Sequence, residues 1–142
     1  MLKDIVKDAR LLSAGQHQFT LNIDEQLFYF GQADELRSAF SNLIFNAVRY
    51  TPDPGIIDVR WYKDKDQCIF EVIDNGIGIP EKHVDRITQR FYQVDKSRTY
   101  RGIGGTGLGL AIVKHVLIRH DGELLIQSHL GEGSRFRCQL PE

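Results

Sequence analysis

A chain of 142 residues, 42% of them hydrophobic, has the size of one domain with one core. Its formal net charge of −1 excludes a global positive field, so we expect no nucleic-acid partner. No apolar run approaches a membrane span, and the first residues do not resemble a signal peptide. The chain as given is therefore predicted to be cytosolic, with Cys68 and Cys138 as buried free thiols.

The first third of the chain predicts a helix, a strand and a second helix. Residues 2–12 place apolar side chains at helical spacing, and nothing nearby in the sequence covers this stripe, as if a longer helix ended here. Residues 19–23 alternate as a half-buried strand, and residues 27–31 (LFYFG) are expected to pair nearby. Residues 34–50 predict a long helix, capped by Asp34 and ended before Pro52.

The middle of the chain contains the clearest hairpin. Residues 56–62 and 67–74 both alternate between apolar and polar side chains, and a polar turn separates them. A short helix is expected after Pro80. Residues 88–105 follow neither the helical nor the strand period, and a stretch of this length is usually functional or disordered.

The last third predicts one helix and a second hairpin. Residues 106–120 read as a helix that is apolar nearly all round and therefore buried. Residues 123–128 and 134–140 read as paired strands. The sum is an α+β fold: a two-layer α/β sandwich of a mixed, mainly antiparallel sheet with helices on one face.

The first long helix has a polar face that indicates a ligand site. Asn42, Asn46, Arg49 and Tyr50 fall within about one third of its circumference. Asparagine is a poor helix former, so two on one face lower stability unless their amides are used. An amide oxygen suits Mg²⁺ and an arginine suits phosphate. A merely solvated face is the alternative.

A carboxylate ends the second strand of the first hairpin. Asp74 is followed by Gly76 and Gly78, which lack side chains that would keep a flat ligand from the backbone. A carboxylate only accepts hydrogen bonds, so it would select a ligand edge with an N–H donor, such as an adenine amino group. The alternative is an ordinary glycine turn before the helix at Pro80.

A second glycine cluster, GIGGTGLGL, opens the last helix. Backbone N–H groups and the positive end of the helix dipole would suit a phosphate there. The P-loop pattern is absent, and a dinucleotide fingerprint would need a preceding strand, where this chain has the polar run DKSRTYR. The basic residues before the cluster predict a lid over phosphates, with a solvated loop as the alternative: Arg90, Lys96, Arg98 and Arg101.

Four stretches, NLIFNAVRYTP, DNGIGIP, RFYQVD and GGTGLGL, together resemble one known family. In this order and spacing they are similar to the ATP-binding catalytic domain of bacterial sensor histidine kinases, within the group that includes gyrase B, Hsp90 and MutL. The resemblance covers residues 17–142 and implies the Bergerat ATP-binding fold of that group. Finer details are most similar to the phosphate-regulon branch, and so to signalling under phosphate limitation.

The resemblance implies ATP and Mg²⁺ as cofactors. It makes Asn46 the Mg²⁺ ligand with Asn42 alongside, and places Arg49 on phosphate where the family usually has lysine. These three are the implied catalytic residues. Tyr50 would pack near the adenine and Asp74 would accept from its amino group. The implied nucleotide-binding set is completed by Gly76, Gly78, Ile79, Arg90, Phe91, Gly105, Thr106, Gly107, Leu108 and Gly109.

Two departures from the wider group bear on function. Many members carry FERF in the lid, whereas this chain has TQRF at residues 88–91, so the first aromatic anchor is missing. Hydrolases of the group carry a glutamate base at the position of Asn42, and an amide cannot take a proton. Transfer of the γ-phosphoryl group is therefore expected; an ATP hydrolase and a nucleotide-gated docking module remain the alternatives.

The phosphoacceptor is expected on another domain. The family's acceptor histidine lies on a dimerising helical hairpin, and no histidine here has its context: His17, His83, His115, His120 and His129. Residues 1–16 are predicted to be a linker or the end of that hairpin, and the chain a monomeric fragment with an introduced Met1, inactive alone. Its implied partners are the phosphoacceptor domain of the same kinase and a response regulator, in a homodimer at the inner membrane.

Overall fold

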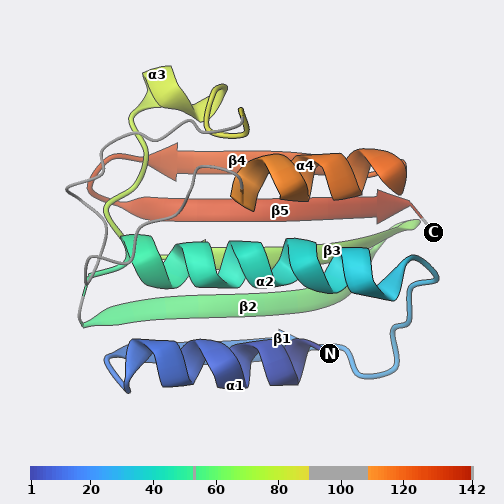
Figure 1. Cartoon of the computed structure of the whole chain (residues 1–142), viewed down its shortest axis with the longest axis horizontal. Coiled ribbons are helices and arrows are strands. Elements are labelled where there is room, and N and C mark those ends of the chain that lie inside the picture. The colour runs from blue at the N-terminus through green and yellow to red at the C-terminus, as the bar shows by residue number, and fades with distance from the viewer. Residues whose placement is uncertain (53, 90–108, 142) are drawn as a thin grey trace.

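The computed structural model describes residues 1–52, 54–89 and 109–141, and these form two layers (Figure 1). One layer is a five-stranded sheet in the order β1-β2-β3-β5-β4, and the helices cover one of its faces. The strands are β1 (His17–Ile23), β2 (Gly55–Asp64), β3 (Gln67–Asp74), β4 (Glu123–His129) and β5 (Gly133–Pro141). The helices are α1 (Leu2–Ser13), α2 (Ala33–Tyr50), α3 (Glu81–Val84) and α4 (Gly109–Arg119). The predicted fold class is confirmed.

The pairing of the strands places β3 at the centre of the sheet. β1 pairs with β2 in parallel, which α2 makes possible by crossing over the sheet between them. The other pairs are antiparallel, so the two hairpins predicted from alternation, β2–β3 and β4–β5, are confirmed. Asp74, the last residue of β3, thereby lies between Ile57 of β2 and Ser134 of β5.

One core lies between the sheet and the helices, and α1 belongs to it. The apolar stripe of α2 packs on alternate residues of the strands, Cys68 and Cys138 among them as buried free thiols. The apolar side of α1 was expected to have nothing local to cover it. In the structure Ile5, Val6 and Ala9 are buried in the same core, because α1 packs on α2 and β1. The proposed boundary after residue 16 stays a prediction.

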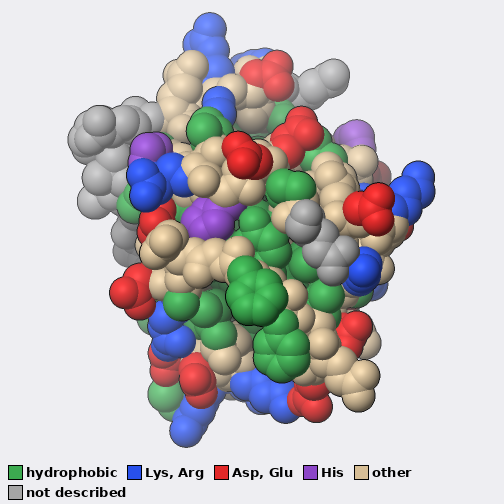
Figure 2. Space-filling view, turned by 90° about the vertical axis from the view of Figure 1, so that its right-hand side faces the viewer, with side chains coloured by type: hydrophobic (Ala, Val, Ile, Leu, Met, Phe, Trp, Pro, Cys, Tyr) green, Lys and Arg blue, Asp and Glu red, His purple; other side chains and the backbone are tan. Residues whose placement is uncertain are grey.

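Three local expectations were wrong. The cap of α2 is at Gln32 without a side-chain hydrogen bond, and Asp34 lies in the first helical turn, where its charge suits the helix dipole. Residues 27–31 form no strand; Phe28 and Phe30 are 76% and 96% exposed there. Figure 2 faces this end of the molecule and shows hydrophobic side chains at its surface. The last helix, α4, is only partly buried, with Ile118 exposed.

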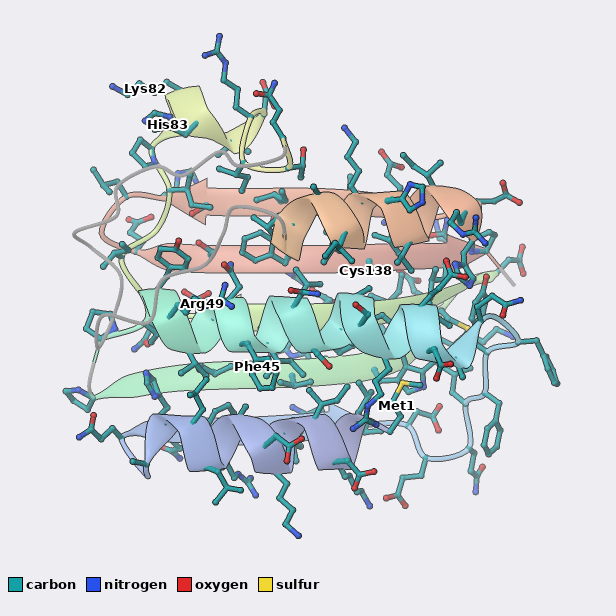
Figure 3. All side chains as sticks on the ribbon, viewed as in Figure 1. Met1, Phe45, Arg49, Lys82, His83 and Cys138 are labelled. Carbon is teal, nitrogen blue, oxygen red and sulfur yellow. The ribbon has the colours of Figure 1, made fainter. Side chains whose placement is uncertain are left out.

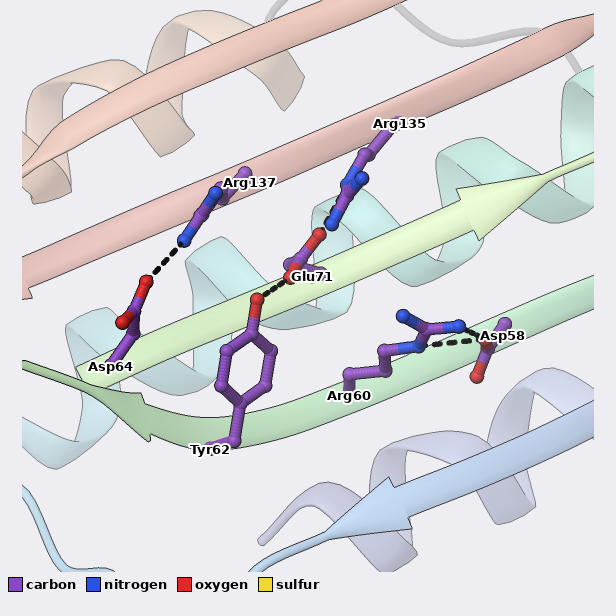
Figure 4. A network of polar contacts seen from close by, with 7 residues as sticks. All are labelled: Asp58, Arg60, Tyr62, Asp64, Glu71, Arg135 and Arg137. Carbon is purple, nitrogen blue, oxygen red and sulfur yellow. Dashed lines mark hydrogen bonds and ion pairs between the residues drawn. The ribbon is translucent and has the colours of Figure 1, made fainter.

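The face of the sheet away from the helices is charged, and its charges pair across strands (Figure 4). Glu71 of β3 is fully buried and accepts hydrogen bonds from Tyr62 of β2 and Arg135 of β5. These bonds hold the pKa of Glu71 below its usual value although burial raises it. Arg60 pairs with Asp58 and Arg137 pairs with Asp64 on the same face.

Candidate functional site

Asp74 is a buried carboxylate that its own backbone surroundings hold in place. Its side chain ends the central strand and the residue is only 8% exposed. The backbone N–H of Gly76 donates to Oδ1 at 2.9 Å, and the N–H of Ser134 on β5 also bonds the carboxyl group. Burial raises the pKa of Asp74 to about 6, and these hydrogen bonds oppose the rise. The group is therefore mostly ionised at pH 7, at a cost in folding free energy.

The loop of residues 75–79, called the glycine loop, contacts the end of α2 on one side. The N–H of Ile77 donates to the carbonyl oxygen of Tyr50 at 3.1 Å. A Cβ atom on Gly76 would collide with the same carbonyl, and would lie 2.9 Å from both the Asp74 carboxylate and Thr51 Oγ1. The packing of the protein itself therefore requires glycine at position 76. That this glycine also lets a ligand approach the backbone stays a prediction.

The β4–β5 turn clasps the same loop on the other side. Gly78 has φ +73°, and a Cβ there would collide with the carbonyl of His129. Ser128 Oγ accepts from the N–H of Ile79 at 2.7 Å, and the N–H of Gly131 donates to Ile77 at 2.7 Å. Residues 75–79 are consequently fixed by backbone contacts to two elements that are distant in the sequence.

The four predicted residues of α2 lie on the helix as expected, and all are partly buried. The Asn42 amide is oriented: Nδ2 donates to the Ser38 carbonyl at 2.7 Å, and Oδ1 lies 2.8 Å from the place of a Cβ on Gly109. The first residue of α4 thus packs on Asn42. A carboxamide in any case cannot act as a general base at neutral pH.

Arg49 carries an unsatisfied buried donor. It lies in the last turn of α2 (Figure 3), and its Nε atom is buried without a hydrogen-bond partner among the described residues. Buried N–H groups of native proteins are rarely left unpaired, and such exceptions often mark a ligand site. An anion beside Arg49 would satisfy it.

The remaining predicted residues fall outside the described part of the chain: Arg90, Phe91, Gly105, Thr106, Gly107 and Leu108. Most of the predicted lid lies there too, but Thr88, at the position of the missing aromatic anchor, is described and partly buried. Within the described ranges, no three His, Cys, Asp or Glu side chains come together as a metal cluster. No helix in those ranges is long and apolar enough to cross a bilayer.

Three polar side chains at the site, two buried and one (Ser128) partly buried, were not found from the sequence. Thr51 and Ser134 flank Asp74, and Ser128 bonds both the Ile79 backbone and the Ser134 hydroxyl. Asp74 and Ser134 also line a groove of about 780 Å³ beside α3, together with Asp85 and His129. These contacts depend on strand register, so the local sequence gives no signal for them.

Comparison with known proteins fits this geometry. A family model described as histidine kinase-, DNA gyrase B-, and HSP90-like ATPase matches residues 31–142. The chain belongs to this family. Within it, the chain is 53% identical over 141 residues to the phosphate regulon sensor protein PhoR of Pseudomonas aeruginosa, a match that covers 99% of this chain and 32% of that protein. The chain therefore spans about a third of the length of this relative.

Solved structures of family members agree in fold. The mycobacterial sensor histidine kinase MprB superposes with a TM-score of 0.85 at 26% identity, covering 98% of this chain and 91% of that one. Full-length ShkA, in complex with AMPPNP, superposes with a TM-score of 0.79 at 24% identity, covering 99% and 30%. The resemblance to the catalytic domain of sensor histidine kinases, and to the phosphate-regulon branch, is confirmed.

Proposed function

We propose that this domain binds ATP with Mg²⁺ and, within a longer sensor kinase, transfers the γ-phosphoryl group to a histidine of a separate helical hairpin. The observation that carries the proposal is Asp74: a buried, backbone-held carboxylate at the end of the central strand. The family and the AMPPNP complex of ShkA support a nucleotide as the ligand.

Asp74 would select adenine. With its pKa near 6 the carboxylate is an acceptor at neutral pH, and the adenine amino group is a donor. Guanine carries an acceptor oxygen at the equivalent position, so GTP would leave two acceptors facing each other. Because Asp74 is held by the backbone of Gly76 and Ser134, it cannot easily turn away from the wrong base.

The phosphates would lie beside the C-terminal half of α2, next to the base end of the site. The unsatisfied Nε of Arg49 and the start of α4 at Gly109 both suit an anion. The amide oxygen of Asn46 would be a ligand of Mg²⁺. When bound, Mg²⁺ neutralises negative charge on the phosphates during transfer. Arg49 would do the same from the protein side and hold the phosphates in line.

Transfer is favoured over hydrolysis by the state of Asn42. Hydrolysis needs a base near the attacking water, and a carboxamide such as that of Asn42 is not basic; its contacts with Ser38 and Gly109 hold it in place. The acceptor would be an imidazole nitrogen of the hairpin, which attacks the γ-phosphorus while the bond to the β–γ bridging oxygen breaks and ADP leaves. A response regulator would then take the phosphoryl group, and the longer protein would be a homodimer at the inner membrane.

Calorimetric titration tests the binding step first. The isolated domain should bind ATP more tightly with Mg²⁺ than without it, and GTP poorly. Equal affinity for ATP and GTP would remove the role of Asp74.

Radiolabelled ATP tests the transfer step. The domain alone should neither label itself nor release phosphate steadily, because it lacks both a water-activating base at Asn42 and the acceptor hairpin. Addition of the hairpin domain of the same kinase should give an acid-labile, base-stable label on that domain. Steady phosphate release by the isolated domain would support the hydrolase, and binding without transfer to a competent hairpin would support a docking module.

A further inference from the structure

A line of buried polar contacts joins the end of α1 to Asp74. The hydroxyl of Ser13, the last residue of α1, accepts from the backbone N–H of His17 at 3.3 Å. The His17 ring, at the start of β1, contacts the carbonyl oxygen of Thr51 through Nε2 at 2.5 Å. The Thr51 hydroxyl then faces Asp74. Four elements, α1, β1, α2 and β3, thus meet at one point.

The direction of the His17 contact is fixed by its partner. A carbonyl oxygen only accepts, so Nε2 carries the proton and donates it to Thr51. His17 is only 7% exposed, and it stands opposite Gly55 in the parallel ladder. A Cβ on Gly55 would lie 2.9 Å from the His17 ring and would collide with the Thr51 methyl group. Thr51 therefore packs closely against Gly55, beside the His17 ring.

The Thr51 hydroxyl is placed for Asp74. The side chain is fully buried, and Oγ1 has no hydrogen-bond partner of ordinary geometry among the described residues. It lies near enough to the Asp74 carboxyl to lower the pKa of that group. A hydroxyl in this place can donate to the carboxylate, and it stabilises the ionised form that a base donor requires.

We propose that Thr51 and His17 are positioning residues for base recognition, so that the junction of α1 and β1 is mechanically joined to the adenine acceptor. His17 holds the Thr51 carbonyl, and Thr51 holds the Asp74 carboxylate in its orientation. The inference rests on the proposed role of Asp74 in binding adenine. It makes the position of α1 a determinant of nucleotide affinity, although α1 contributes no side chain to the base site.

Thr51→Val tests the hydroxyl, because valine keeps the shape and removes the donor. Titration of ATP from pH 5.5 to 8 should show the midpoint of its affinity shifted upward by about half a pH unit, with about a twofold loss near pH 6. Thr51→Ser should restore the native midpoint. The other titratable groups near Asp74 are the same in both proteins: Asp85 just after α3, His129 of β4, Glu132 of the β4–β5 turn, Arg135 of β5, and Arg49 and Tyr50 of α2.

His17→Phe and His17→Gln test the second link. Phenylalanine keeps the ring and removes the donor, so it should shift the midpoint in the same direction and reduce the preference for ATP over GTP. Glutamine can still donate to Thr51 and should preserve more of both. Circular dichroism identifies variants that fail to fold, and Thr51→Ala, which also lacks the donor, replaces Thr51→Val in that case.

The outcomes separate the two proposals. If the native protein does not bind ATP, or Asp74→Asn binds it equally well, the proposed function fails. If Asp74→Asn behaves as expected but Thr51→Val and His17→Phe keep the native pH profile and base preference while only losing stability, the contacts are structural and this inference is overturned.

Discussion

The two ends of the proposed nucleotide site are built differently. At the base end, Asp74 is buried, and backbone groups of α2, β5 and the β4–β5 turn hold it and the following loop in place. At the phosphate end, Asn46 and Arg49 project from a single helix, are partly exposed, and leave the Arg49 Nε unsatisfied. The base end is therefore formed before the ligand arrives, and the phosphate end is completed by it. Substitutions at the two ends should differ in kind.

The largest effect is expected from Gly78→Ala, which strains the backbone of the loop at the base end. An alanine there would adopt an unfavourable positive φ and also collide with His129, which should cost about 3 kcal/mol of unfolding free energy by chemical denaturation. Gly131→Ala is the matched control: its φ is also positive, at +83°, but its side chain would meet open space. It should lose about 1 kcal/mol. Equal losses would contradict the clasp of the loop by the β4–β5 turn.

Asp74→Asn should separate binding from stability. ATP binding is expected to weaken by about 1 to 3 kcal/mol, the size of a hydrogen bond to a charged group. The free energy of unfolding should rise by up to about 2 to 3 kcal/mol at pH 7. The carboxyl group, whose pKa is raised from 3.8 to about 6 on folding, destabilises the native protein increasingly above pH 3.8 and fully above about pH 6. Asp85→Asn, in the same groove, should do neither. A variant that loses both affinity and stability would mean that Asp74 serves the fold.

Asn46→Ala should weaken binding only where the metal is present. Loss of a Mg²⁺ ligand should cost about tenfold in ATP affinity with Mg²⁺ and little without it. Asn42→Ala is the comparison, because its amide is committed to Ser38 and to the start of α4. It should weaken both titrations alike. If Asn46→Ala also weakens both by one factor, the phosphate end is as preformed as the base end.

The smallest effect concerns pH. Since the ionised form of Asp74 accepts from adenine, affinity should fall as pH decreases through about 6, by about twofold between pH 7 and pH 6. The ATP phosphates titrate in the same range, so the measurement is the ratio of native to Asp74→Asn affinity at each pH. A ratio that stays constant from pH 7.5 to 5.5 would place the pKa of Asp74 well below the value that its burial implies.

The sequence was sufficient where a local pattern determines the structure. Alternation predicted both hairpins, and helical spacing placed Asn46 and Arg49 on one face of α2. The sequence was not sufficient where contacts between distant segments determine the structure. The burial of α1 depends on α2, and the role of Ser134 depends on its register opposite Asp74, sixty residues earlier in the chain. Glycines 76 and 78 were found, but their packing partners could not be read from the loop itself.

The parallel ladder of β1 has a consequence for how the domain opens. Among the described strands, β1 lies at the edge and pairs with β2 alone. The chain reaches β2 from β1 only after α2 has crossed the sheet, whereas β2–β3 and β4–β5 are closed by short turns. Local hairpins form early, and a partner that requires closure of a long loop is added later. The amide hydrogens of β1 should therefore exchange with solvent through partial unfolding that leaves β3 protected. Such an opening would detach His17 from Thr51 without melting the sheet.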